Sequence, residues 1–108
     1  MKETKKQIAK SLPFEEETTR KGAYILRALN NGLRQKILKL IHTHKCVNVT
    51  TIYVKLHIEQ SVASLHLRIL READFVKTQR IGKEIYYSLN YECLAQVNKL
   101  VIQVTKAN

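Results

Sequence analysis

Side chains able to pair with the edges of nucleic-acid bases lie along one side of residues 60–71. They are Gln60, Ser61, Ser64, Leu65 and Arg68. Glutamine, serine and arginine can form hydrogen bonds in the major groove of DNA, and leucine can contact a thymine methyl group. The positions between them recur at the spacing of an apolar helix face, and these are Val62, Ala63, His66, Leu67 and Leu70. The segment therefore predicts a helix that reads DNA. An ordinary amphipathic surface helix is the alternative.

Three cations follow in a segment that predicts a β-hairpin. Residues 75–79 and 84–89 have the composition of strands, and residues 80–83 join them through Gly82. Lys77, Arg80 and Lys83 can follow the DNA backbone or enter the minor groove, which adds affinity with little base information. The alternative is an edge hairpin whose charges only prevent aggregation, and both interpretations can hold at once.

Other segments of the chain predict the elements that would hold this reading helix. Helices are expected over residues 14–29, 33–42, 50–56 and 91–104, with a break at 30–32 and turns at 43–48 and 57–59. A tight helix–helix turn often needs a residue at positive φ, and His57 or Asp74 could serve. A short helix, a turn, a second helix and a basic hairpin predict a winged helix-turn-helix. This is a mainly α fold with about five helices and a two-stranded wing.

The charge and the cysteine content agree with a domain that binds nucleic acid. The chain has 108 residues, and its 19 lysines and arginines outnumber 9 aspartates and glutamates. A formal net charge of +10 attracts nucleic acid or an anionic membrane surface, although charge alone could also serve only solubility. Two distant cysteines and the lack of a membrane-length apolar run favour the cytoplasm. We expect a flexible basic tail over residues 1–13 and a single winged-helix domain over residues 14–108.

The last predicted helix carries an apolar stripe that needs a cover. The stripe consists of Leu94, Val97, Leu100, Val101 and Val104. In so small a domain, the cover must come from the first helix or from a second subunit. A twofold dimer would present two reading helices to two half-sites about one helical turn apart. We therefore predict a homodimer with this stripe in its interface.

Residues with metal-binding or redox chemistry do not form a convincing site. His42, His44 and Cys46 have ligand types suited to zinc or a softer metal, but such residues in a turn are commonly incidental. Cys46 and Cys93 could form a redox pair, although buried inert cysteines are commoner. The sequence holds no glycine-rich phosphate loop, no HExxH motif and no nucleophile elbow. We expect no enzyme, no metal and no cofactor.

Three segments resemble the ArsR-type (ArsR/SmtB-like) winged helix-turn-helix repressors, which are small homodimeric bacterial regulators. Residues 28–38 resemble the family's AL-(A/S)-D-P-T-R-x-x-IL segment, with Arg34 kept and Asn31-Gly32 in place of Asp-Pro. Residues 61–73 resemble its SxxxSxHLxxLREAG signature, with Asp74 for the glycine, and residues 76–89 resemble its wing, V-x-x-x-R-x-G-(R/K)-x-(V/I)-Y-Y-x-L. The resemblance implies a dimer through the first and last helices, operator binding in the major groove and release by an inducer.

The sites through which this family senses metals do not carry over to this chain. The family's Cys-x-Cys at the start of the third helix corresponds to Asn48 and Thr50, and no histidine follows His66. A dithiol sensor of the family uses a cysteine of the second helix, and Cys46 lies beyond that helix. A response to an unknown small-molecule inducer, to thiol chemistry or to no ligand all stay open.

Together these features predict a cytoplasmic, homodimeric, sequence-specific DNA-binding regulator, a repressor that occupies an inverted-repeat operator. One alternative is a winged-helix module that binds another protein instead of DNA. Another is a basic protein that binds nucleic acid without sequence preference and with strong salt dependence.

Overall fold

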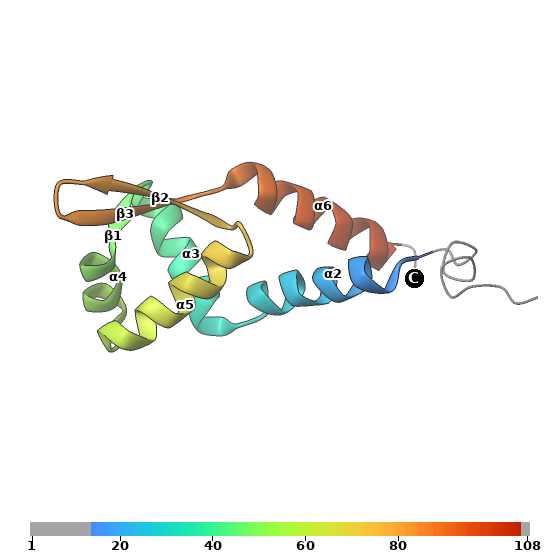
Figure 1. Cartoon of the computed structure of the whole chain (residues 1–108), viewed down its shortest axis with the longest axis horizontal. Coiled ribbons are helices and arrows are strands. Elements are labelled where there is room, and N and C mark those ends of the chain that lie inside the picture. Colours follow the sequence, from blue (N-terminus) through green and yellow to red (C-terminus); the bar gives the residue numbers. More distant parts are fainter. Residues whose placement is uncertain (1–13, 107–108) are drawn as a thin grey trace, which may run out of the picture.

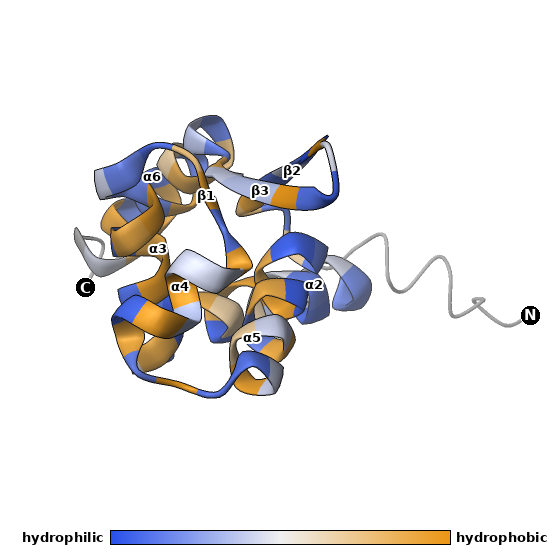
Figure 2. Ribbon diagram, turned by 90° about the vertical axis from the view of Figure 1, so that its left-hand side faces the viewer, coloured by the Kyte–Doolittle hydropathy of each residue, from blue (hydrophilic) through white to orange (hydrophobic). Residues whose placement is uncertain are grey.

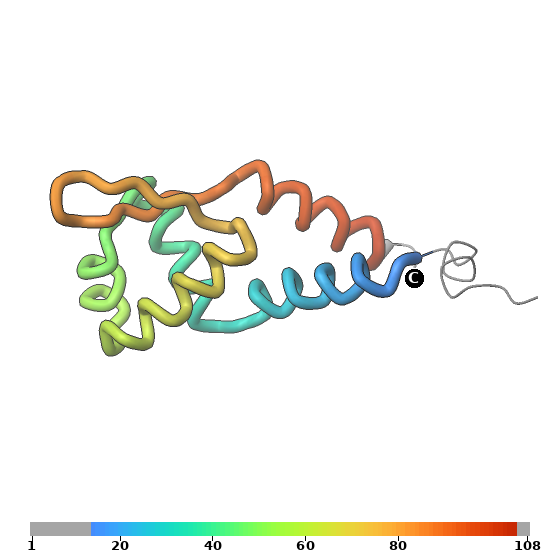
Figure 3. Tube along the Cα trace, viewed as in Figure 1, coloured from blue at the N-terminus to red at the C-terminus, as the bar shows by residue number. Residues whose placement is uncertain are grey.

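Three helices and a small sheet enclose the core, and two further helices extend away from it and converge (Figure 1). The computed structural model describes residues 14–106. Its helices are α2 (Glu16–Leu29), α3 (Gly32–His44), α4 (Val49–Leu56), α5 (Gln60–Glu72) and α6 (Tyr91–Lys106). Helices α3, α4 and α5 pack against one another, whereas α2 and α6 form the extension that the Cα trace makes visible (Figure 3). The tail predicted over residues 1–13 lies outside the described residues.

The core is apolar throughout the part of the chain that the structure describes. Its largest fully buried side chains are Ile37, Ile41, Ile52, Leu67, Leu70 and Phe75. Burial of each such side chain contributes about 1.5–3 kcal/mol relative to exposure. Ile37 and Ile41 are one turn apart in α3, as are Leu67 and Leu70 in α5, so one stripe of each helix faces the core. Figure 2 shows the resulting alternation of polar and apolar residues along these helices.

Two asparagines define where α3 and α4 begin. The Oδ1 atom of Asn31 accepts a hydrogen bond from the backbone N–H of Arg34 at 3.0 Å. The Oδ1 atom of Asn48 accepts bonds from the backbone N–H of Thr51 at 2.9 Å and from its hydroxyl at 2.8 Å. Asparagine is among the preferred N-cap residues because its side chain satisfies an N–H that has no partner within the helix.

The sheet has three strands, not the two predicted. The strands are β1 (Val47–Asn48), β2 (Val76–Ile81) and β3 (Glu84–Leu89), in the antiparallel order β1-β3-β2. Val47 pairs with Tyr87 and Asn48 with Tyr86, inside the segment 43–48 predicted as a turn. A strand of two residues is too short to show alternation, and its pairing with β3 depends on contacts distant in sequence.

Both residues proposed for positive φ adopt it. His57 has φ 55° between α4 and α5, and Asp74 has φ 64° between α5 and β2. Lys45, at φ 71° after α3, was not predicted. Gly82, at φ 64° in the hairpin turn, is the residue type that this backbone region favours. These positions reverse the chain around α4, α5 and the wing.

Helix α2 forms as predicted but does not bury the face expected of it. The apolar spacing of its sequence places Ala23, Tyr24, Ile25 and Leu26 on the inner side. Ile25 packs against the core, whereas the other three are exposed, and Leu26 is 47% accessible. Ala28, near the end of the helix, is the buried residue of α2. Ile25 and Leu26 line a cleft toward α6, whereas Tyr24 lies on the α5 side, where its hydroxyl bonds to Glu72. No helix within residues 14–106 combines the length and the apolar character needed to cross a membrane.

Candidate nucleic-acid interface

The five residues expected to face DNA share the outward side of α5. All of them are exposed, whereas Ala63, Leu67 and Leu70 on the opposite side are buried. Leu65 is 45% accessible. The exposed set consists of Gln60, Ser61, Ser64, Leu65 and Arg68. The helix therefore offers donors, acceptors and one apolar contact to a partner outside the molecule.

The three basic wing residues are exposed, but they do not share one face of the hairpin. Lys77 pairs with Ser88 and Arg80 with Ile85 in an unbroken register. Because successive side chains of a strand point to opposite faces, Arg80 lies on the same face as buried Val76, and Lys77 lies on the outer face. Lys83 stands in the turn between β2 and β3.

A groove of about 390 Å³ separates α5 from the wing. It is lined by Asn48, Val49, Thr50, Ser64, Lys83, Glu84, Ile85 and Tyr87. The groove brings together Ser64 of the helix set and Lys83 of the wing set, together with the first turn of α4. That turn contains no acidic residue, and the N–H groups at the start of a helix favour phosphate. Asn48 followed by Thr50 and Thr51 is the helix-start signal that could have identified this contribution from the sequence.

Glu84 connects the wing to the start of α4. Its Oε2 atom accepts a hydrogen bond from Asn48 Nδ2 at 3.0 Å and one from the Tyr86 hydroxyl at 3.2 Å. The hydrogen bond to Glu84, together with the carboxylate's negative charge, raises the pKa of Tyr86. Asn48 therefore caps α4 with its oxygen and bonds to β3 with its nitrogen, and both Asn48 and Glu84 line the groove.

Arg34 of α3 contacts both α2 and α5. Its Nε donates to the Ala28 carbonyl at 2.7 Å, its Nη2 donates to the Arg27 carbonyl at 3.3 Å, and its Nη1 lies 3.1 Å from His66 Nδ1. Arginine only donates, so Nδ1 accepts and the imidazole is neutral. Burial lowers the pKa of His66, and the positive charge of Arg34 lowers that pKa further. His66 thus has the structural role expected of it, with a partner that spacing alone did not reveal.

This contact predicts a stability loss in acid. The folded state favours neutral His66, so its contribution is complete above the ordinary histidine pKa of about 6.5 and is lost as the pH falls below it. His66→Gln keeps an acceptor for Arg34 but cannot be protonated. We expect a smaller drop in the urea midpoint between about pH 7.5 and about pH 5.5 for this variant than for the unaltered chain. His44→Gln, on the exposed end of α3, should leave that drop as it is; equal drops for all three proteins would contradict the prediction.

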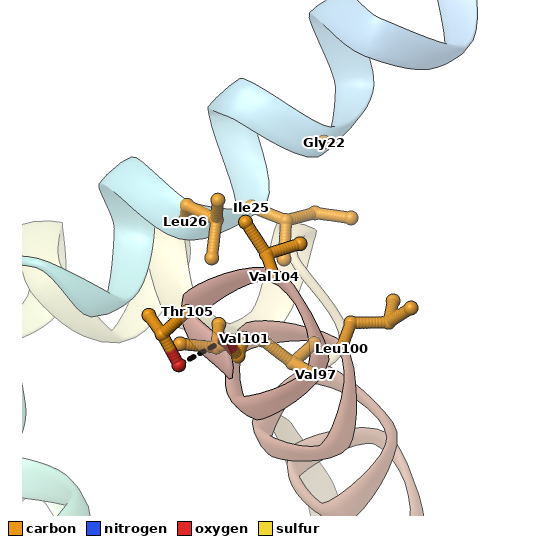
Figure 4. A pocket seen from close by; sticks show the side chains of 8 residues that line it. All are labelled: Gly22, Ile25, Leu26, Val97, Leu100, Val101, Val104 and Thr105. Carbon is orange, nitrogen blue, oxygen red and sulfur yellow. Dashed lines mark hydrogen bonds between the residues drawn. The ribbon is translucent and has the colours of Figure 1, made fainter. Parts of the chain in front are cut away.

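The apolar stripe of α6 meets α2 across an open cleft of about 250 Å³ (Figure 4). The cleft is lined by Gly22, Ile25, Leu26, Val97, Leu100, Val101, Val104 and Thr105. Leu94 and Val97 are half-buried against the core, whereas Leu100 is 60% exposed and Val104 63%. The five predicted interface residues therefore form one face whose outer half the protomer leaves exposed.

The potential metal ligands lie apart in the structure. His42 Nδ1 is 2.8 Å from the Tyr91 hydroxyl, and the two rings meet edge to face. His44 Nδ1 lies 3.0 Å from the Leu40 carbonyl oxygen. Cys46 is exposed, and Cys93 is half-buried with its pKa raised by burial and by the nearby Asp74 and Glu92 carboxylates. Between residues 14 and 106, no three histidine, cysteine or acidic side chains are grouped as a metal site requires.

No protein-family model matches the chain. Its similar proteins and similar solved structures nevertheless agree with one another. The transcriptional repressor PagR of Bacillus anthracis is 37% identical over 79 residues, which are 73% of this chain and 79% of PagR. Its crystal structure superposes with a TM-score of 0.63 at 33% identity and covers 80% of this chain and 99% of that one. The chain therefore shares with PagR both its sequence pattern and its arrangement of elements.

Two further relatives identify the wider group. The HTH-type transcriptional repressor SmtB of Mycobacterium tuberculosis is 36% identical over 74 residues, 68% of this chain and 53% of that protein. A homodimeric winged helix-turn-helix DNA-binding domain from Mycobacterium bovis, a possible ArsR-family regulator, superposes with a TM-score of 0.67 at 28% identity, over 83% of this chain and 82% of that one. PagR and SmtB are both named as transcriptional repressors. By its wing, its reading helix and its identity to these proteins, the chain belongs to the ArsR/SmtB family of winged helix-turn-helix transcriptional regulators.

Proposed function

We propose that this DNA-binding regulator represses transcription by occupying an inverted-repeat operator as a homodimer. The observation that carries the proposal is the division of α5 into a buried apolar side and an exposed side with the five predicted residues. The relatives PagR and SmtB are named as transcriptional repressors, which supports the sign of regulation. A repressor of this kind acts where the DNA is, in the cytoplasm.

The proposed contacts divide into base reading and backbone binding. Gln60, Ser61, Ser64, Leu65 and Arg68 of α5 read base edges in the major groove. The first turn of α4, together with Arg80 and Lys83, binds phosphates on either side of the groove between α5 and the wing. Lys77, on the outer face of β2, adds charge that attracts DNA at longer range.

The proposed dimer would cover the apolar face of α2 and α6. In one protomer the outer part of this face is exposed, and exposed apolar patches on small proteins commonly mark interfaces. The related domain from Mycobacterium bovis is homodimeric, and it matches most of this chain. A twofold axis at this face would place both α5 helices toward the same side of a DNA duplex.

Selection from a random duplex library tests the proposal. Purified protein is incubated with the library at about 0.15 M salt, where contacts to phosphates are partly screened. Enrichment of an inverted repeat is the expected result. Binding without enrichment of any sequence would favour a non-specific basic protein, and folded protein that binds no duplex would favour a protein-interaction module. Either outcome would contradict the proposal.

Single substitutions on α5 should weaken binding to the enriched sequence. Arg68→Ala and Ser64→Ala each remove a proposed base contact, and a good base contact contributes about 1–3 kcal/mol, with the serine at the lower end. The measurement is fluorescence anisotropy with the operator duplex. Arg20→Ala, on exposed α2, removes the same charge elsewhere and should have little effect. Unchanged operator affinity for both α5 variants would mean that another surface reads DNA.

Removing one wing cation should act on all sequences alike. Lys83→Ala deletes one proposed phosphate contact, so the slope of log affinity against log salt should decrease by about one unit. The loss should be equal for the operator and for a scrambled duplex. Lys99→Ala, on exposed α6, is the matched control and should keep the original slope. A Lys83→Ala slope equal to the control slope would remove Lys83 from the interface.

A further inference from the structure

Glu72 lies between the proposed base-reading arginine and helix α2. Its Oε1 atom is 3.9 Å from Arg68 Nε, and its Oε2 atom accepts a hydrogen bond from the Tyr24 hydroxyl at 3.4 Å. Glu72 ends α5 one turn after Arg68, whereas Tyr24 lies in α2, 48 residues earlier in the chain. One carboxylate thus connects a side chain on the DNA-facing surface with a helix of the α2–α6 extension.

The contact engages the guanidinium through an atom that base reading does not require. Glu72 approaches Nε, and within residues 14–106 no hydrogen bond or ion pair occupies the two terminal nitrogens of Arg68. Arginine pairs with guanine through two parallel N–H groups directed at O6 and N7, which the terminal nitrogens can supply. The anchored geometry therefore leaves Arg68 able to bind a base.

Anchoring also limits the freedom of a long side chain. An unrestrained arginine must lose rotamer entropy to reach one base, and it can equally bind any nearby phosphate. A carboxylate beside it repels phosphates and disfavours that second, sequence-independent use. Tyr24, in turn, restrains the carboxylate from a different helix.

We propose that Glu72 is a specificity-determining residue that positions Arg68 for base reading, and that Tyr24 holds Glu72 in place. The proposal rests on the proposed function, because it assumes that Arg68 reads a base. An exposed ion pair adds little to folding stability, so the effect should be found in discrimination between sequences rather than in the stability of the protein.

The test compares affinity for the selected operator with affinity for a scrambled duplex at the same salt concentration. Glu72→Gln should raise affinity for the scrambled duplex more than for the operator, so that the ratio of the two falls about two- to fivefold, the range spanned by exposed ion pairs. Glu72→Asp keeps the charge but withdraws the carboxylate, and it should also lower the ratio. Tyr24→Phe should lower it less. Glu92→Gln removes a negative charge from α6 and should leave the ratio unchanged.

A double-variant cycle separates positioning from general charge. In an Arg68→Ala background, Glu72→Gln should leave the ratio unchanged, because no guanidinium remains to be positioned. An unaltered ratio in the single Glu72 variants, or the same decrease with and without Arg68, would overturn the role of Glu72. If Arg68→Ala itself leaves operator binding intact, the base-reading assignment fails and the role of Glu72 fails with it. Loss of operator affinity in Arg68→Ala with no response to Glu72 would reject the positioning role alone.

Discussion

Replacement of Leu100 by aspartate should yield a monomer that no longer binds the operator tightly. Leu100 lies on the α2–α6 cleft and is 60% exposed in the protomer, so the change should leave the core intact. In a twofold interface the new carboxylate would be buried twice, and each buried, unpaired charge costs several kcal/mol. Sedimentation at several concentrations should show the monomer, and operator affinity should fall by about 100-fold or more, since a loss of 2.7 kcal/mol already amounts to that factor.

A matched variant on the same helix tests whether position or charge is responsible. Ala95→Asp introduces the same side chain at an exposed position on the side of α6 away from the cleft. This variant should remain a dimer and should bind the operator, apart from a small effect of the added charge. A dimeric Leu100→Asp protein with normal operator binding would show that the α2–α6 face is not the interface.

Phe75→Ala should lower the free energy of unfolding by about 3–5 kcal/mol, the usual cost of removing a buried phenylalanine ring. Phe75 is fully buried between α5 and β2. Its N–H donates to the Leu70 carbonyl of α5, and its carbonyl accepts from the N–H of Asn90, just before α6. Small proteins are stable by only about 5–15 kcal/mol, so this variant should lose a large share of its stability. Urea denaturation followed by circular dichroism measures the change.

The chain supplies its own control for this experiment. Its other phenylalanine, Phe14, is 54% exposed, and Phe14→Ala should change the free energy of unfolding by no more than about 0.5 kcal/mol. Similar losses in the two variants would contradict the position of Phe75 in the core. Addition of operator DNA should partly restore the midpoint of Phe75→Ala, because a ligand that binds only the folded state stabilises it.

The elements that could be predicted from sequence are those whose signals are local. Helix α5 was predicted because Ala63, Leu67 and Leu70 recur at helical spacing, and the hairpin because Gly82 separates two strand-like segments. The exposed positions of the proposed reading residues follow from the same periodicity. Their roles toward DNA stay predictions until the substitutions are measured.

Features that depend on distant contacts could not be predicted. Strand β1 has two residues and exists because Val47 and Asn48 pair with β3, nearly 40 residues later. The contact of Arg34 with His66 and that of Tyr24 with Glu72 join helices whose packing the sequence does not specify locally. Apolar spacing places Leu26 on a face that must be covered, but this spacing does not show whether the same chain or another chain covers that face.

The residues at positive φ have a consequence for motion. Lys45 at the end of α3, and His57 and Asp74 at the two ends of α5, carry side chains that restrict the backbone more than glycine would at the same positions. Asn90 bonds to the Asp74 carbonyl through its side chain and to Phe75 through its backbone, which fixes the start of α6 to the same unit. We therefore expect a rearrangement of the proposed dimer to rotate each unit as a rigid body. Such a rotation would change the distance between the two half-sites that the dimer can bind, while the contacts inside each half-site would be preserved.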